Sequence, residues 1–278
     1  MPDPTGPTNA PTAVDPNKPS IARVYDYCLG GKDNYEIDRV VFNSVGQMLP
    51  APEQLAKVNR SFMIRAVRWL ARDAGIDQFL DCGSGLPTMQ NVHQVAQHHQ
   101  PEATVVYVDN DPVVQAHGRA LLEDNDRTFF AGADFTQPDR LLTNEIVTSQ
   151  LDFTRPIGLV HCATLHHVPE EQDPWGVMRH LIGALPAGSF VALSHVHDPG
   201  DEHYGGIVRT INERAQQAGT GGGLDVRFRS RGQIEALFDG AELVDPGVVR
   251  LADWYPEGPA ELHEPWDHLF LGGIGHKP

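Results

Sequence analysis

The feature that most constrains the fold of this chain is a repeated alternation of short β-branched runs with amphipathic stretches. Apolar runs of the length of a buried strand occur at 78–82, 104–108, 128–131, 158–162 and 190–196. The helices expected to alternate with them span 89–99, 113–123, 175–185 and 204–218. Such alternation indicates a parallel sheet that is covered on both faces. The sequence therefore predicts an α/β protein.

Two more apolar runs follow, at 242–249 and 268–272, after a short helix expected near 233–238. No helix-length amphipathic segment lies between these two runs. Because antiparallel strands need only a short connection, we expect the two runs to finish the sheet as an antiparallel pair.

The residues before the first predicted strand divide into two segments. Residues 1–19 hold six of the 22 prolines and almost no large apolar side chain, so burial cannot offset their ordering entropy. We expect a disordered proline-rich tail there, a helical cap over 20–76 and the ligand-binding domain over 77–278. In the cap, short helices are expected over 21–29 and 35–48, broken by Gly30 and Gly31, and apolar residues at steps of three and four predict a helix over 53–74.

Charge and composition exclude several classes of function. Acidic residues outnumber basic ones 37 to 21, for a formal net charge of −16, so no nucleic-acid partner is expected. No apolar run approaches the ~18 residues of a membrane span, and the N-terminal residues lack the pattern of a signal peptide. The widely spaced Cys28, Cys82 and Cys162 fit neither a disulfide framework nor a zinc site. We therefore expect a cytoplasmic protein without a membrane partner.

A glycine-containing turn follows the first predicted strand. The strand ends at Asp81, the turn contains Gly83 and Gly85, and a helix is expected from about Thr88. Glycine lets the backbone approach a ligand closely. The turn differs from the dinucleotide fingerprint G-x-G-x-x-G, because the third glycine is missing and Pro87 removes an N–H donor.

Acidic residues mark the ends of the next two predicted strands. A carboxylate at Asp109 can accept two hydrogen bonds from a ribose diol. Asp111 is placed to cap the following helix, with Pro112 at its first position, which explains Asp111 but not Asp109. After the third strand, Asp134 can accept a hydrogen bond from an adenine amino group, with Phe135 near the base. For Asp109 and Asp134 the alternative is an ordinary turn residue.

Together the three strand ends describe a nucleoside pocket at the carboxyl edge of a parallel sheet. Its ligand is either NAD(P) or S-adenosylmethionine. None of the six tyrosines has a lysine four residues later, so the Tyr-x-x-x-Lys pair of short-chain dehydrogenases is missing. The missing third glycine argues against a pyrophosphate, and an adenosyl ligand without phosphates suits an acidic protein better. S-adenosylmethionine is therefore favoured.

The order of these motifs resembles that of class I S-adenosylmethionine-dependent methyltransferases. Segments similar to one actinobacterial S-adenosyl methyltransferase family, formerly a domain of unknown function, are ARVYDYCLGGKDNYEIDR (22–39), NRSFMIRAVRWL (59–70), QFLDCGSGLPT (78–88), VVYVDNDPVV (105–114), RFRSRGQIEALFDG (227–240) and PGVV (246–249). The resemblance covers about residues 20–277. It implies a Rossmann-like, mostly parallel seven-stranded sheet with an antiparallel last strand, plus an N-terminal helical segment.

The resemblance also implies contacts with the cofactor at four strand ends. They are Asp81, Gly83 and Gly85 with the methionine moiety, Asp109 with the ribose, Asn110 next to the adenine, Asp134 and Phe135 at the adenine edge, and His161 and Cys162 beside the sulfonium. The resemblance implies no methyl acceptor.

Histidines are the candidate catalytic residues. His166 and His167 follow the fourth predicted strand and His195 lies in the fifth. An imidazole with a pKa of about 6.5 can take a proton from an acceptor atom, although a polar pocket lining or ordinary hydrogen bonding would also explain these residues. His195 and His197 share one face of their strand. No Cys or Glu lies near them in sequence and methyl transfer needs no metal, so no metal site is predicted.

Three of the six tyrosines, Tyr25, Tyr27 and Tyr35, lie close together around Gly30 and Gly31. A phenol joins an apolar body to a hydrogen-bonding tip, and a glycine pair offers a joint for a lid. We expect this segment to cover the cofactor cleft and its tyrosines to line the acceptor pocket. The alternative is a helical pair that only packs on the sheet.

These observations predict an S-adenosylmethionine-dependent methyltransferase that acts on a small-molecule acceptor and releases S-adenosylhomocysteine. The alternatives are a module that binds S-adenosylmethionine without turnover and, less favoured, an NAD(P)-dependent oxidoreductase.

Overall fold

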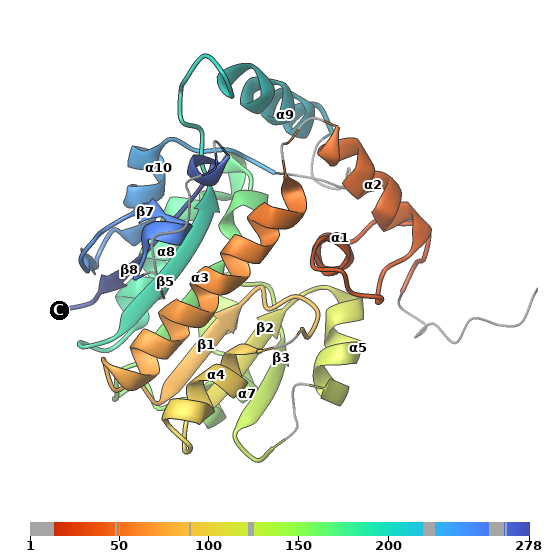
Figure 1. Cartoon of the computed structure of the whole chain (residues 1–278). Coiled ribbons are helices and arrows are strands. Elements are labelled where there is room, and N and C mark those ends of the chain that lie inside the picture. The colour runs from red at the N-terminus through yellow and green to blue at the C-terminus, as the bar shows by residue number, and fades with distance from the viewer. Residues whose placement is uncertain are drawn as a thin grey trace, which may run out of the picture.

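A mixed β-sheet forms the centre of the molecule, here in a computed structural model that describes residues 14–47, 49, 51–88, 90–121, 125–218, 226–255, 264 and 266–278 (Figure 1). The strands of this described part are β1 (Gln78–Cys82), β2 (Thr104–Asp109), β3 (Thr128–Gly132), β4 (Gly158–Cys162), β5 (Phe190–Val196), β6 (Glu242–Leu243), β7 (Val249–Arg250) and β8 (Phe270–His276). Their order is β3-β2-β1-β4-β5-β8-β6, with β7 paired to β8. The pairs among β1 to β5 are parallel, and β8 is antiparallel to each of its neighbours. The predicted α/β class, with a mostly parallel sheet and an antiparallel last strand, is confirmed.

The C-terminal strands differ from the prediction in detail. The run expected at 242–249 is two short strands, β6 and β7, so the described sheet has eight strands instead of seven. Between them the chain turns at Pro246, which has no N–H to donate to a ladder, and at Gly247, whose φ is +83°. The last strand begins at Phe270 and continues to His276, later than expected, and it pairs along its whole length with β5.

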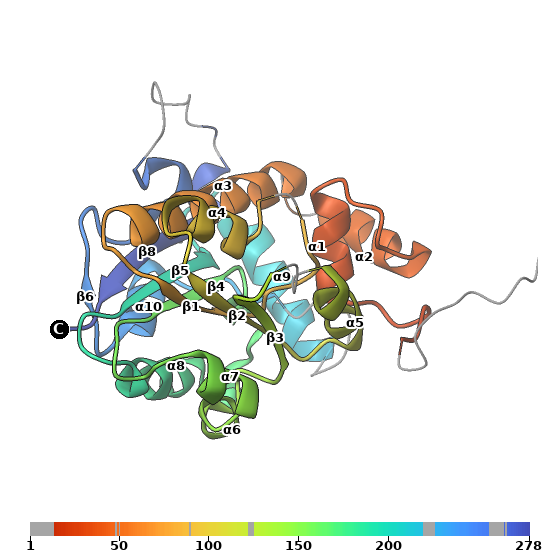
Figure 2. The same cartoon turned by 90° about the horizontal axis from the view of Figure 1, so that it is seen from below.

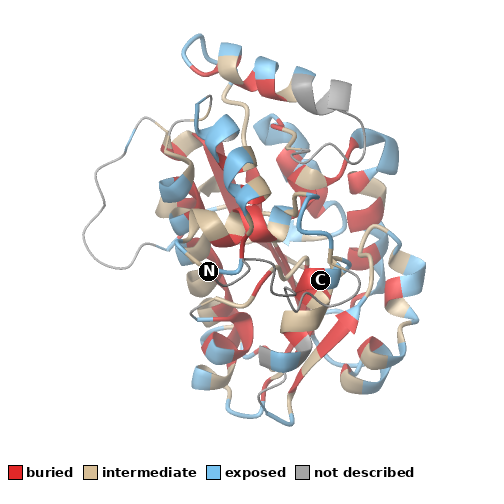
Figure 3. Cartoon of the chain, turned by 90° about the vertical axis from the view of Figure 1, so that its right-hand side faces the viewer, coloured by how far each residue is buried: buried red, intermediate tan, exposed pale blue. Residues whose placement is uncertain are grey.

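Helices cover both faces of the sheet (Figures 1 and 2). One face carries α3 (Pro52–Arg72) and α4 (Val92–His99), and the other carries α6 (Pro138–Leu142), α7 (Glu145–Gln150) and α8 (Pro174–Ala184). Alternate strand residues face these two layers: Tyr107 packs in the cluster that contains Phe62 of α3, while Val106 packs in the cluster that contains Met178 of α8. Figure 3 shows the buried residues concentrated in the strands and on the helix sides that face them.

Two short helices, α1 (Ile21–Cys28) and α2 (Glu36–Gly46), form a cap beside the sheet, and α5 (Pro112–Leu121) lies next to them (Figure 1). Arg23 of α1 and Asp38 of α2 form a buried ion pair at 2.7 Å, and Asp38 also accepts hydrogen bonds from the backbone N–H groups of Ser20 and Tyr35. The two cap helices are therefore fixed to each other.

The loop between the cap helices is also held in place. The carboxylate of Asp26 accepts hydrogen bonds from the backbone N–H of Asp33, at 3.0 Å, and from Nδ2 of Asn34, at 2.9 Å. A Cβ at Gly31 would lie within 1.9 Å of the Asp26 carboxylate, so glycine is required there by close approach. The glycine pair that suggested a joint is thus part of a hydrogen-bonded turn.

The remaining helices include α9 (Gly205–Ala218) and α10 (Arg231–Glu235). No helix among the described residues is both long and apolar enough to cross a membrane. Of the expected proline-rich tail, residues 1–13 lie outside the described residues, and Val14 packs partly buried against the core.

Candidate functional site

A cavity of about 1020 Å³ lies at the carboxyl ends of β1 to β4 and is walled by the cap helices and by α3. Residues predicted from the sequence to bind the cofactor that line this cavity are Asp81, Gly83, Gly85, Asp109, Asn110, Asp134, Phe135 and Cys162. Side chains from four strand ends therefore meet in one cavity, because parallel strands end at the same edge of a sheet.

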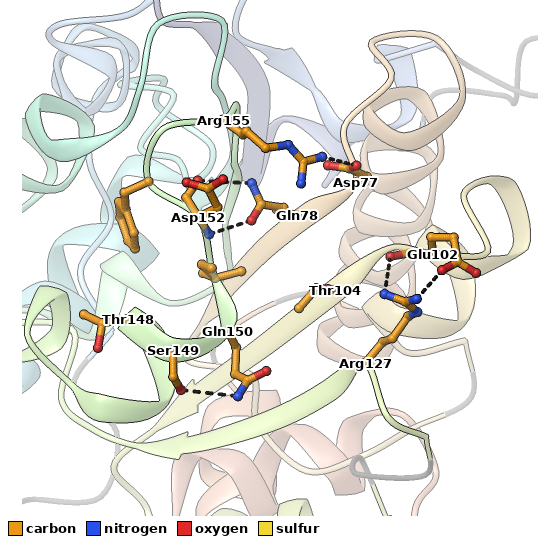
Figure 4. Close-up of a pocket in the computed structure, with 12 residues that line it drawn as sticks. Asp77, Gln78, Glu102, Thr104, Arg127, Thr148, Ser149, Gln150, Asp152 and Arg155 are labelled. Atoms are coloured by element: carbon orange, nitrogen blue, oxygen red, sulfur yellow. Dashed lines mark hydrogen bonds and ion pairs between the residues drawn. The ribbon is translucent and has the colours of Figure 1, made fainter.

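A second pocket, of about 620 Å³, lies at the opposite edge of the sheet (Figure 4). Four of its five charged side chains form ion pairs, Arg155 with Asp77 and Arg127 with Glu102, and Asp152 accepts hydrogen bonds from Thr154. The side chain of Gln78 in this pocket hydrogen-bonds to backbone groups. Since none of the residues predicted to bind the cofactor lines this pocket, the larger cavity is the candidate site.

The glycine turn is built around Asp109. One carboxylate oxygen of Asp109 accepts a hydrogen bond from the backbone N–H of Gly85, and the other accepts from that of Asp111, both at 2.9 Å. Gly83 donates its N–H to the carbonyl of Val108 at 2.7 Å. A carboxylate can accept about four hydrogen bonds, so Asp109 keeps acceptor capacity for a ligand. Asp109 therefore has a structural role that the sequence did not reveal, in addition to its place in the cavity.

The two acidic residues nearest the turn have unusual proton affinities. Burial raises the pKa of Asp109 to about 6, against the lowering effect of the backbone N–H groups of Asp111, Gly85 and Asn110. Burial also raises the pKa of Asp81 to about 7; Arg60 of α3 acts in the opposite direction and Asp109 adds to the rise. A cationic group beside either carboxyl would stabilise its ionised form and lower its pKa.

Arg60 and its neighbour Asn59 line the cavity but were not predicted. The sequence does contain a pattern that points to them, because these two polar residues lie on the side of α3 that otherwise buries Leu55, Phe62 and Met63. Attention to polar residues on an apolar helix face would have found them.

The adenine-edge residues adopt a turn that also faces the cavity. One oxygen of Asp134 accepts hydrogen bonds from the backbone N–H and the hydroxyl of Thr136, at 2.9 and 2.7 Å. The ring of Phe135 lies 5.1 Å from that of His161, in an edge-to-face arrangement. Asp134 therefore both stabilises this turn and lines the cavity.

His161 is not among the residues that line the cavity. It is completely buried behind Phe135, and its Nδ1 lies 3.1 Å from the hydroxyl of Thr164. Burial lowers its pKa to about 3, so the imidazole stays neutral. The structure thus places Cys162 at the cavity wall and His161 on the other side of β4.

A chain of hydrogen bonds joins α1 to the ends of β4 and β5. The hydroxyl of Tyr25 donates to the carbonyl of Ala56 at 3.2 Å and accepts from Nδ2 of Asn59 at 2.9 Å. The Ser194 hydroxyl donates to Oδ1 of Asn59 at 2.5 Å and accepts from the backbone N–H of Ala163 at 2.9 Å. Burial raises the pKa of Tyr25 to about 12, so its phenol stays protonated.

The other two cap tyrosines occupy different positions. Tyr25 lines the cavity, whereas Tyr27 and Tyr35 are not among its lining residues. The ring of Tyr27 packs edge-to-face on Phe42 at 5.1 Å, and the guanidinium of Arg23 lies over the ring of Tyr35 at 4.7 Å. Both rings help to hold α1 against α2.

The three candidate catalytic histidines also occupy different positions relative to the cavity. His166 and His167, in the short 3-10 helix η1 (Leu165–His167), line the cavity, and His195 does not. Both ring nitrogens of His195 are engaged at 2.7 Å, Nδ1 with the carbonyl of Val196 and Nε2 with Nη1 of Arg229. Burial lowers the pKa of His195 to about 3. His195 therefore orients Arg229, and its nitrogens are not available to an acceptor.

The second histidine of the β5 pair is engaged as well. Nδ1 of His197 lies 2.6 Å from the carbonyl oxygen of His268. Within the part of the chain that the structure describes, no group of three histidine, cysteine or acidic side chains is arranged to hold a metal ion.

The cavity fits an adenosyl ligand with an amino-acid tail. The Ser84 hydroxyl, in the turn, is buried without a hydrogen-bond partner among the described residues, which leaves it for a ligand. A Cβ at Gly85 would meet no atom within 4 Å, so the turn is open on that side. Acidic groups at two strand ends suit a diol and an ammonium group.

This mostly parallel sheet, with its glycine turn and acidic strand ends, defines a Rossmann-like methyltransferase that binds S-adenosylmethionine. The chain belongs to the S-adenosyl methyltransferase family, whose sequence model matches residues 7–278. No curated protein matches the chain.

Solved structures support this assignment. The crystal structure of a candidate methyltransferase from Thermobifida fusca is 39% identical, with a TM-score of 0.86 over 94% of this chain and 96% of that one. A protein from Streptomyces avermitilis, of a family of unknown function, is 36% identical, with a TM-score of 0.84 over 94% and 98% of the two chains. The N-methyltransferase NodS from Bradyrhizobium japonicum, in complex with S-adenosyl-L-homocysteine, is 11% identical with a TM-score of 0.50 over 92% and 99%, and so shares the fold alone.

The two turn glycines give a first prediction. Both have positive φ, +72° at Gly83 and +65° at Gly85, but a Cβ at Gly83 would lie 2.6 Å from the Thr164 side chain. We expect Gly83→Ala to lower the free energy of unfolding by about 2–4 kcal/mol and Gly85→Ala by only about 1 kcal/mol. Urea denaturation of both variants measures this difference. Equal losses would show that the contact with Thr164 relaxes freely.

Proposed function

We propose that the protein transfers a methyl group from S-adenosylmethionine to a small-molecule acceptor that occupies the same cavity. The observation that carries this proposal is the extent of the cavity. It reaches from the glycine turn, past Cys162, to the side chains of Ile211 on α9 and Phe270 on β8. Its volume of about 1020 Å³ lies at the upper end of the usual range of small-molecule sites, which leaves room for two reactants.

In this proposal the chain's own residues bind the cofactor in three places. The Asp81 carboxylate and the turn at Gly83 and Gly85 hold the methionine part. Asp109 accepts hydrogen bonds from the ribose hydroxyls, for which its free lone pairs are suited. Adenine lies beside Asn110, Asp134 and Phe135, and His161 supports Phe135 from behind.

The protein contributes mainly position and the exclusion of water. The bound cofactor supplies a methyl group that is attached to a positively charged sulfur. The leaving group is a neutral thioether, so it needs no proton. Tyr25 and Asn59 tie the cap to the strand ends, so the cap keeps the cavity covered. Fixing two reactants in line removes much of the entropic cost of their encounter.

We further propose a cytoplasmic location, since Cys28, Cys82 and Cys162 are unpaired.

Turnover with a cell extract tests the proposed function. The purified protein, S-adenosylmethionine and a small-molecule extract of cells are expected to yield S-adenosylhomocysteine, measured by mass spectrometry. The extract alone and Asp109→Ala protein are the controls. Tight binding of S-adenosylmethionine with no product from any extract would support a binding module instead. Stabilisation by NAD(P) but not by S-adenosylhomocysteine would favour an oxidoreductase.

A further inference from the structure

The cavity has a second part, away from the glycine turn, that we name the apolar arm. Its side chains are aliphatic or aromatic and come from β5, α9, residues 226–228, the 3-10 helix Asp267–Leu269 and the first residue of β8; they are Val196, Ile211, Val226, Phe228, Leu269 and Phe270. Hydrogen bonds fix this wall, because the Asn212 side chain accepts from the backbone N–H of Phe228 at 2.9 Å. A preformed apolar surface of this kind binds an apolar body.

One polar side chain faces this arm from η1. His166 lines the cavity, is only 5% exposed, and its ring lies 5.9 Å from that of Phe270. Its carbonyl accepts the backbone N–H of Arg227 at 2.8 Å, which joins η1 to the wall. Nδ1 of His166 is buried and has no hydrogen-bond partner among the described residues. A buried nitrogen without a partner is uncommon, and a ligand that completes the hydrogen bond explains it.

The charge around this arm disfavours an ionic ligand. None of its six lining side chains is charged, so an acidic or basic group bound there would lose its water without gaining a counter-ion. Burial, His167, His195 and Arg229 all lower the pKa of His166, so its imidazole is neutral. Neither Arg227 nor Arg229 lines the cavity, so neither supplies a counter-ion to an acidic group there. A hydroxyl group has no such cost and can hydrogen-bond to a neutral imidazole.

We propose that the apolar arm is the acceptor subsite and that the acceptor is an uncharged aromatic molecule whose hydroxyl group hydrogen-bonds to His166. The inference rests on the proposed function, because it identifies the class of acceptor for that reaction. The aromatic preference follows from Phe228 and Phe270, whose ring edges and faces suit another ring. His166 then sets where the hydroxyl oxygen lies relative to the cofactor.

Binding of 2-naphthol to the protein saturated with S-adenosylhomocysteine tests the inference by calorimetry at pH 7. We expect 2-naphthol to bind at least tenfold more tightly than 2-naphthoate, because the carboxylate has no counter-ion in the arm. Ile211→Glu is expected to weaken 2-naphthol binding at least tenfold without changing the affinity for S-adenosylhomocysteine. Thr210→Glu adds the same charge on the exposed side of α9 and is expected to change neither affinity.

The role of His166 has its own measurement. The unsubstituted protein is expected to bind 2-naphthol about threefold to tenfold more tightly than naphthalene, and His166→Phe is expected to remove this preference. Ile211→Trp, which fills the arm without adding charge, provides a second test if Ile211→Glu does not fold. Equal binding of 2-naphthol and 2-naphthoate, no binding of 2-naphthol, or no effect of either Ile211 variant would overturn the inference. Failure to bind S-adenosylhomocysteine would instead overturn the proposed function.

Discussion

Asp109→Ala is expected to weaken S-adenosylmethionine binding about 100-fold, equivalent to roughly 2.7 kcal/mol. The variant loses the carboxylate proposed to accept the ribose hydroxyls, and with it the two hydrogen bonds that position Gly85 and Asp111. Charge-assisted hydrogen bonds of this kind contribute about 1.5–3 kcal/mol each, part of which water restores. Isothermal titration calorimetry with S-adenosylmethionine and S-adenosylhomocysteine measures the change.

Asp109→Asn is the matched control, because it keeps the size of the side chain and one acceptor oxygen. We expect it to lose about tenfold in affinity, between the unsubstituted protein and the alanine variant. An affinity unchanged in Asp109→Ala would remove this residue from the ribose site and leave it only its role in the turn.

Asp81→Asn is expected to move stability and binding in opposite directions. The folded protein raises the pKa of this carboxyl to about 7 by burial, whereas the unfolded chain has the ordinary value of about 4. Between these values the folded state holds a proton that the unfolded state releases, so ionisation of Asp81 reduces stability as pH rises through this range. Asparagine cannot ionise and avoids this loss. At pH 8 the ligand-free variant is expected to be more stable by at least about 1 kcal/mol, or roughly 2–4 °C in Tm.

The same substitution is expected to weaken S-adenosylhomocysteine binding at least tenfold at pH 8, because the carboxylate proposed to face the ammonium group is gone. Thermal denaturation from pH 4 to pH 8 measures the first effect, and the Tm difference is expected to vanish at the acid end. Asp126→Asn, at an exposed position before β3, serves as the control for lost charge. A variant that is less stable than the unsubstituted protein at pH 8 would contradict the assignment of Asp81 as a buried carboxylate kept for ligand binding.

The sheet could be predicted because its strands are continuous apolar runs, whose pattern does not depend on distant residues. Two elements, α6 and α7, were not predicted, since helices of five and six residues are too short to show a 3.6-residue period. The division of the run at 242–249 depends on local turn chemistry at Pro246 and Gly247, which the apolar pattern of the run concealed.

The residues at the strand ends could be expected to line one cavity, because the topology of a parallel sheet brings them to the same edge. The apolar arm was not predicted because its residues, such as Ile211 and Phe270, meet only through tertiary packing. Tyr25 and Tyr27 show that residues close together in sequence need not face the same site. Two residues apart on a helix, they are separated by roughly 200° around its axis, so one lines the cavity while the other packs on α2.

The place of β8 in the sheet has a consequence for the order in which the protein can fold during synthesis. This strand lies between β5 and β6, although it is synthesised after all the other strands of the described sheet. Until Phe270–His276 emerges, the edge of β5 that includes Val191 and Leu193 has no partner to pair with. The parallel half of the sheet can assemble first, but it presents an open, apolar edge for as long as translation of the last third of the chain takes. The nascent protein is therefore most vulnerable to association with other chains after its parallel strands β1 to β5 are complete and before β8 pairs with β5.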